Sequence, residues 1–260
     1  MDAALRALNR FGLGARRGER QRISDPKSWL KAQLDGGAPS LHANDIPSPA
    51  LIGDAARGLR MPGQLDEQQR RQARRNLVEL SAGEARTALE ARISSDRPFV
   101  ERLVAFWSNH LCVLGGSKIL VAPLAGSYER DVIRPHVLGR FEDMVLASAK
   151  HPAMLAYLDN FQSIGPGSPG ARVGPHNNGA KRGLNENYAR ELLELHTLGV
   201  NAGYTQEDVQ ELARILTGWT IDGIGGAAAR VPQGNQRRGS GVIRRARPEP
   251  GSAIGFAFRD

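Results

Sequence analysis

The feature of this sequence that most restricts its fold is a pair of amphipathic helical patterns between Asn185 and Thr217. At about 100° per residue, one arc of the first pattern collects apolar side chains and a histidine: Tyr188, Ala189, Leu192, Leu193, Leu195 and His196. Gly199 follows as a helix stop, and Thr205 with Asp208 forms a capping box for the second pattern. That pattern continues with apolar residues at helical spacing: Val209, Leu212, Ala213 and Leu216. We therefore expect a helix hairpin, with its first helix over 185–198.

This hairpin is acidic within a basic chain. Two arginines, Arg190 and Arg214, oppose six acids, Glu186, Glu191, Glu194, Glu207, Asp208 and Glu211, which gives 2 − 6 = −4, whereas the whole chain carries +8. The acidic face needs arginines from elsewhere in the fold, water, or a divalent metal ion held by oxygen ligands. The sequence leaves solvation with arginine pairing and a metal or substrate site both open.

Two histidines fall on apolar helix faces. His196 lies in the apolar arc of the hairpin, and His110 shares a side of helix 97–111 with apolar residues: Phe99, Val100, Leu103, Val104, Phe106, Trp107 and Leu111. A buried imidazole needs a hydrogen-bond partner. Each histidine is therefore either bonded within the core, or both reach one polar pocket between helices 97–111 and 185–198. The chain has no His-Glu-x-x-His motif, nucleophile elbow or phosphate-binding glycine loop.

The rest of the chain reads as a mostly α protein. We expect short helices at 2–11 and 26–34, a polar helix at 64–93 broken near Gly83, and three short helices across 126–160 with Pro135 and Pro152 at boundaries. Long Gly/Pro/Arg-rich loops fall at 36–63, 164–183 and 222–251. These patterns predict an irregular multi-helix bundle with a C-terminal helix hairpin. Its domains would be a single α-helical domain over 1–221, then a flexible Arg/Gly-rich segment with the strand-like start of a further element over 222–260.

Composition excludes several classes of protein. Of the 35 basic residues 30 are arginine, and the excess positive charge sits in segments 57–75, 164–183 and 222–251. No aromatic residues interleave there as stacking platforms, so dedicated nucleic-acid binding is not expected. The single cysteine, Cys112, excludes an intramolecular disulfide and a multi-cysteine metal site. No apolar run is long enough for a transmembrane helix, and the first twenty residues do not form a signal peptide.

Three stretches together resemble a bacterial family named domain of unknown function 1800 (DUF1800). They are "RLVAFWSNHL", "YERDVIRPHVLGRFEDMVLASAKHPAMLAYLDN" and "GLNENYARELLELHTLGVNAGYTQEDVQELARILTGWT", and "LNRFGLGARRGE" and "WLKAQLD" fit as well. The resemblance covers nearly all of residues 5–221, and Asp159 with Asn160 matches the family's Leu-Asp-Asn. It implies a mostly α-helical fold and no established activity.

The resemblance also implies context and departures. Family members are often exported, and they are often encoded beside a sulfatase-related protein, which suggests a partner. Where the family pattern has Phe-Trp-His-Asn-His-Phe, Ser108 replaces the first histidine. Family members also run longer, toward another histidine and a glycine-rich turn, so the chain resembles an N-terminal portion.

Two functions follow from these patterns. The first is a binding or scaffold module that uses the polar face of helix 185–198. The alternative is a hydrolase-like or metal-dependent enzyme, with Glu191 and Glu194 as acid/base groups or cation ligands and Arg190 holding an anion. The full set of candidate residues is Asn109, His110, Asp159, Asn160, Asn185, Glu186, Asn187, Arg190, Glu191, Glu194 and His196.

Overall fold

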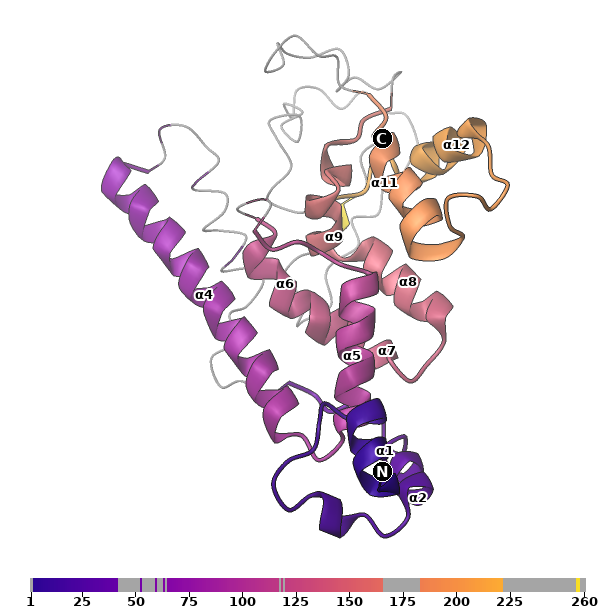
Figure 1. The fold of residues 1–260 in the computed structure, drawn as a ribbon. Coiled ribbons are helices and arrows are strands. Elements are labelled where there is room, and N and C mark those ends of the chain that lie inside the picture. The colour runs from indigo at the N-terminus through magenta and orange to yellow at the C-terminus, as the bar shows by residue number, and fades with distance from the viewer. Residues whose placement is uncertain are drawn as a thin grey trace. The chain divides into compact units, whose positions relative to one another are not determined.

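The computed structural model describes residues 2–41, 52, 59, 63, 65–116, 118, 120–165, 183–221 and 256–257. The chain divides into two compact units, which are described separately. Unit 1 comprises Met1–Pro47 and Arg75–His151, and unit 2 comprises Ser48–Arg74 and Pro152–Asp260. Helices dominate the described residues, as Figure 1 shows, so the prediction of a mostly α fold is confirmed. Most of the three predicted loop segments lies outside the described residues.

Unit 1 is built from helices, four of which contact the segment Glu129–Ile133. Its elements are α1 (Ala3–Phe11), η1 (Arg20–Arg22), α2 (Pro26–Ala32), most of α4 (Glu67–Ser94), α5 (Pro98–His110), α6 (Ala122–Tyr128), η2 (Glu129–Ile133), α7 (Arg134–His136) and α8 (Phe141–Lys150). Asp2 and Asp25 cap α1 and α2 through their carboxylates, as short polar side chains do at helix starts. The core is formed by Leu8, Val100, Val104, Leu111, Leu124, Val132, Ile133 and Met144.

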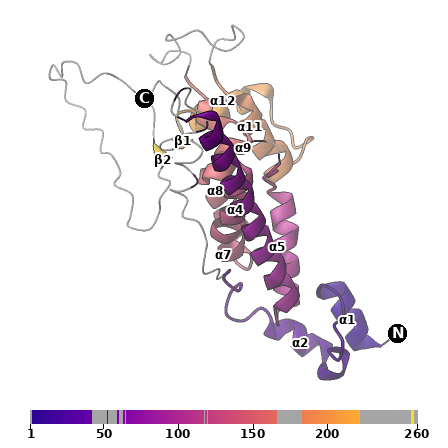
Figure 2. The same ribbon diagram turned by 90° about the vertical axis from the view of Figure 1, so that its left-hand side faces the viewer.

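Helix α4 is one uninterrupted helix of 28 residues, so the break expected near Gly83 is wrong. Figure 2 shows its continuous course. A glycine inside a helix lowers its stability by about 1 kcal/mol relative to alanine. Gly83 is exposed and lies among good helix formers in a long helix, which remains stable despite that loss. The face that packs on unit 1 contains Leu77, Glu84 and Ala88.

The segment Ala122–His136 is a continuous run of helix, and Pro135 lies inside it rather than at a boundary. The expected boundary at Pro135 is therefore wrong, whereas Pro152 does begin a helix, α9 (Pro152–Tyr157). A proline removes one backbone donor and crowds the preceding turn. The wider π-helical turn η2, directly before α7, relieves that crowding.

Several arginines of unit 1 donate to backbone carbonyls that are remote in sequence. Arg16 Nη2 lies 2.7 Å from the Ser95 carbonyl, and Arg97 Nε lies 2.9 Å from the Gln33 carbonyl. Arg102 donates to the Gly12 carbonyl. These guanidinium groups tie the N-terminal segment to α5, so part of the positive charge of the chain serves the fold.

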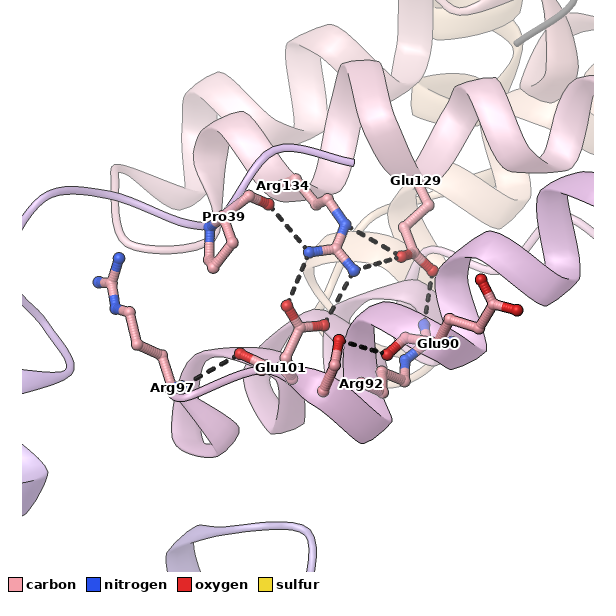
Figure 3. Close-up of polar contacts among 9 residues, drawn as sticks. Pro39, Glu90, Arg92, Arg97, Glu101, Glu129 and Arg134 are labelled. Carbon is pink, nitrogen blue, oxygen red and sulfur yellow. Dashed lines mark hydrogen bonds and ion pairs between the residues drawn. The ribbon is translucent and has the colours of Figure 1, made fainter. Parts of the chain in front are cut away.

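The centre of unit 1 holds a buried charge network around Arg134 (Figure 3). The Arg134 guanidinium, 3% exposed, makes two parallel bonds of 2.9 Å to the carboxylate of Glu101, which is fully buried. It also bonds Glu129 Oε1 at 2.9 and 3.1 Å and the Pro39 carbonyl at 3.0 Å. Arg92 approaches the other Glu129 oxygen at 2.6 Å. Burial alone would lower the pKa of Arg134, but the two carboxylates together raise it.

A second buried pair joins α4 to η2. Arg130 Nη1 lies 3.0 and 2.8 Å from the two carboxylate oxygens of Glu84. Glu84 passes close over α6 at Gly126, where an added Cβ would lie 2.5 Å from both the Cβ and Oε2 of Glu84. Only glycine leaves room for this carboxylate, so Gly126 is required by a close approach.

Unit 2 contains α9, η3 (Asn160–Gln162), α11 (Glu186–Glu191), η5 (Leu192–Thr197), α12 (Gln206–Leu216), β1 (Thr220–Ile221) and β2 (Phe256–Ala257). The two short strands pair antiparallel, with Thr220 opposite Ala257 and Ile221 opposite Phe256. The strand-like character expected near the C-terminal end therefore appears as β2. The buried residues of this unit include Ala153, Met154, Leu155, Phe161, Tyr188, Ala189, Val209, Ala213 and Leu216.

In the part of the chain that the structure describes, no helix is both long and apolar enough to cross a membrane.

Replacing Arg134 with methionine tests the buried network. Arg134→Met leaves two carboxylates buried without their main partner, and breaking such a pair typically costs about 3–5 kcal/mol of unfolding free energy. The matched control is Arg71→Met, because Arg71 pairs with Glu67 at 3.1 Å on the exposed surface of α4. We expect that control to change the unfolding free energy by no more than about 0.5 kcal/mol. Urea unfolding measures both, and equal effects would contradict the account.

Two glycine substitutions test the contact between α4 and α6. Gly126→Ala pushes a methyl group into Glu84, and we expect a loss of about 1–3 kcal/mol of unfolding free energy. Gly83→Ala is the control, because nothing lies within 4 Å of the added Cβ. An alanine in that exposed helical position should stabilise by about 0.5–1 kcal/mol. Thermal unfolding of the two variants should therefore shift in opposite directions; a shift in the same direction would be inconsistent with the close approach at Gly126.

Candidate binding face of the helix hairpin

The predicted hairpin forms from α11, η5 and α12. Thr205 and Asp208 make the expected reciprocal capping box at the start of α12. Gly199, with φ of 95°, adopts the left-handed conformation that ends the first helical segment. Val209, Ala213 and Leu216 are buried, as the helical spacing predicts.

Asn185 fixes the start of α11. Its Oδ1 accepts a hydrogen bond from the Asn187 backbone N–H at 3.0 Å, which caps the helix. Its Nδ2 donates to the Leu158 carbonyl at 2.7 Å, and its own backbone N–H donates to Ser163 Oγ at 3.0 Å. Asn185 thus joins the start of the hairpin to the segment after α9; a binding role for Asn185 or Asn187 stays a prediction.

Asn160 fixes the end of the hairpin. It is fully buried, and its Nδ2 donates to the carbonyl of Leu216, the last residue of α12, at 2.9 Å. Ser163 Oγ and Thr217 Oγ1, 2.8 Å apart, add a second link at the same end. Asp159 precedes Asn160 in the left-handed conformation, with φ of 59°, and accepts from Gln162 Nε2 at 3.2 Å. The Leu-Asp-Asn stretch therefore positions α12, and its proposed binding role stays a prediction.

A π-helical turn changes which side chains of the first hairpin helix face outward. In η5 the Leu198 backbone N–H bonds the Leu193 carbonyl at 2.8 Å, one residue further back than in an α-helix. The projection at 100° per residue therefore fails beyond Leu192. His196 is buried, as expected, but Leu195 is 56% exposed, and its placement in the apolar arc is wrong.

Arg190 links the two helices of the hairpin. Its Nη2 lies 2.6 Å from Gln206 Oε1, and Gln206 Nε2 in turn lies 2.6 Å from Glu186 Oε2. Arg190 Nη1 bonds Glu194 Oε1 at 3.2 Å. Glu186, Arg190 and Glu194, spaced four residues apart, thus form one polar network that includes Gln206 on α12.

The other acids of the hairpin differ in whether they have a partner. Glu194 is also hydrogen-bonded to Tyr204, in the turn between the helices, and burial together with this bond raises the pKa of Tyr204. Glu211 pairs with Arg214. Within residues 183–221, no hydrogen bond or ion pair engages the side chains of Glu191 or Glu207, and Glu191 is half-buried. These two carboxylates are the ones not used inside the hairpin.

Asn109 and His110 lie on α5 in unit 1. Asn109 is exposed, and His110 is half-buried among aromatic rings. The His110 ring centroid lies 5.5 Å from that of Trp107 and 6.3 Å from those of Phe106 and Phe141. Phe106, on the apolar side of this helix, is 58% exposed, so that side is not buried along its whole length. His110 and the hairpin belong to different units, each described by itself, so a pocket shared by helices 97–111 and 185–198 stays a prediction.

The buried ion pairs of unit 1 were not predicted from the sequence. Glu101, Glu84, Arg130 and Arg134 were not among the candidate residues, yet they form two buried ion pairs, Glu101 with Arg134 and Glu84 with Arg130. One signal was present: Glu101 lies between Val100 and Val104 in the apolar run of helix 97–111. A carboxylate there needs a buried cation as its partner.

The described residues contain no preformed metal site. No group of three or more His, Cys, Asp or Glu side chains gathers there as a metal ion would require. The divalent metal therefore stays a prediction, as does the enzyme that would use it.

Comparison with known proteins places the chain in a family. The model of a protein family of unknown function, DUF1800, matches residues 6–258, nearly the whole length. No curated protein and no solved structure matches significantly. The motifs quoted above and this match agree, and the chain is a member of the DUF1800 family.

Proposed function

We propose that the chain is a binding module and that the hairpin face around η5 is its docking surface. Three large apolar side chains in η5 and directly after it support the proposal, because Leu195, Leu198 and Val200 are each more than half exposed. Single exposed leucines are ordinary, but three within six residues make a local apolar patch. The π-helical turn accounts for the exposure of Leu195, because it rotates that side chain out of the buried arc.

The charges around this patch indicate the chemistry of the partner. Glu191 and Glu207 have no partner within residues 183–221, while Arg190 is held by Gln206 and Glu194. An apolar patch that follows Glu191 on the same helical segment, with no partner for this carboxylate within residues 183–221, fits a partner surface that has an apolar centre and basic residues at its rim. The sulfatase-related protein suggested by the family resemblance is the candidate partner.

Co-purification with that sulfatase-related protein tests the proposal. We expect Leu198→Asp to weaken retention by at least about tenfold, because it removes an apolar contact and places a charge in it. Leu13→Asp is the matched control, since Leu13 is also exposed but lies in unit 1, and it should leave retention unchanged. Glu191→Lys should weaken retention most at low salt, where charge attraction is least screened. Equal retention of the wild type and Leu198→Asp would contradict the proposal.

A further inference from the structure

Helix α4 has a second apolar face in addition to the one that packs on unit 1. Five residues form this outer stripe at intervals of three and four: Val78, Ala82, Ala85, Leu89 and Ile93. At about 100° per residue they fall within an arc of roughly 80°. Val78, Leu89 and Ile93 are each more than half exposed, and both alanines are exposed.

The outer stripe is separate from the packed face. Leu77, Glu84 and Ala88 are buried on another face of the helix, roughly 120° round from the middle of the stripe. Figure 1 shows α4 to one side of α5 and α6, and Figure 2, viewed from that side, shows it in front of the helices of unit 1. A helix with apolar residues on two faces buries one of them in its own fold and has the other available for a partner.

Two charged residues border the stripe and specify what can pair with it. Glu79 and Arg86, seven positions apart, lie along the same edge of the stripe, and both are exposed. Residues seven apart occupy equivalent positions in a heptad. In an antiparallel pair of identical helices, equivalent edge positions face each other, so Glu79 of one copy can meet Arg86 of the other, and the contact occurs twice.

We propose that the outer stripe of α4 is the interface for a second copy of this chain, paired antiparallel. The register that joins Glu79 with Arg86 also sets Val78 against Leu89 and Ala82 against Ala85. The small side chains then lie at the centre, where the backbones approach most closely, and the large ones lie on either side. One and the same antiparallel alignment therefore pairs the apolar residues and the opposite charges, which favours a second copy over an unrelated helix.

The interface is small, and the charged residues at its two ends limit the affinity of the dimer. Three large apolar residues from each copy bury less than the about 800 Å² per partner of a standard interface. In the end layer Arg75 faces Arg92, whose guanidinium already pairs with Glu129. The association is therefore a weak, reversible dimer that depends on protein concentration.

Sedimentation of the full chain over an about hundredfold concentration range tests the dimer. Reducing agent is included because Cys112 is exposed and could crosslink two copies. The wild type should sediment as a monomer–dimer equilibrium. Glu79→Arg and Arg86→Glu should each weaken dimerisation by at least about tenfold, because each replaces two attractive contacts with two repulsive ones. Thermal unfolding of both variants at low concentration should match the wild type, since both residues are exposed.

Charge exchange provides the decisive control. An equimolar mixture of the Glu79→Arg and Arg86→Glu proteins should restore association, and so should the double variant, because opposite charges face each other again. A wild type that stays monomeric over the whole range would overturn the proposal. So would failure of the mixture to associate, or an effect of Glu79→Arg without an effect of Arg86→Glu, which is the outcome for parallel helices in which Glu79 meets Arg74.

Discussion

The packing of unit 1 depends on the hydrogen bonds that the Arg134 guanidinium donates. Its five N–H donors meet Glu101, Glu129 and the Pro39 carbonyl, so one side chain joins α5, η2 and the segment after α2. Removing three charged groups from water is costly unless each donor and acceptor is satisfied. The π-helical turn η2 belongs to the same arrangement, because it contains Glu129 and leads directly into Arg134.

The two units use polar residues in comparable ways. In unit 2, Asn160 and Asn185 hold the two ends of the hairpin to the segment after α9, and Arg190 with Gln206 holds its helices together. Much of the polarity that marked this region as a candidate site is therefore structural. The parts left over, two carboxylates and the apolar turn of η5, carry the proposed binding function, and the outer stripe of α4 is a separate surface for self-association.

The sequence predicted the features that depend only on residues close together in the chain. The capping box at Thr205, the stop at Gly199 and the buried face of α12 all follow from nearby residues. The exposure of Leu195 could not be predicted, because a π-helical turn shifts the phase and has no simple sequence signature. The bond from Asn160 to Leu216 and the pair of Glu101 with Arg134 join residues remote in sequence, so only their chemistry, a buried amide and a buried carboxylate, could be anticipated. Pro135 and Gly83 failed as boundaries because tertiary packing outweighs single-residue propensity.

The most direct test of the buried network observes the Arg134 guanidinium itself by nitrogen-15 NMR, with its signals assigned by their loss in Arg134→Lys. A guanidinium that is 3% exposed and fully bonded should give sharp, separate N–H resonances that exchange slowly with water at neutral pH. The exposed Arg71 provides the reference for rapid exchange. Slow, resolved Arg134 signals are predicted, and signals averaged with those of the surface arginines would contradict the account.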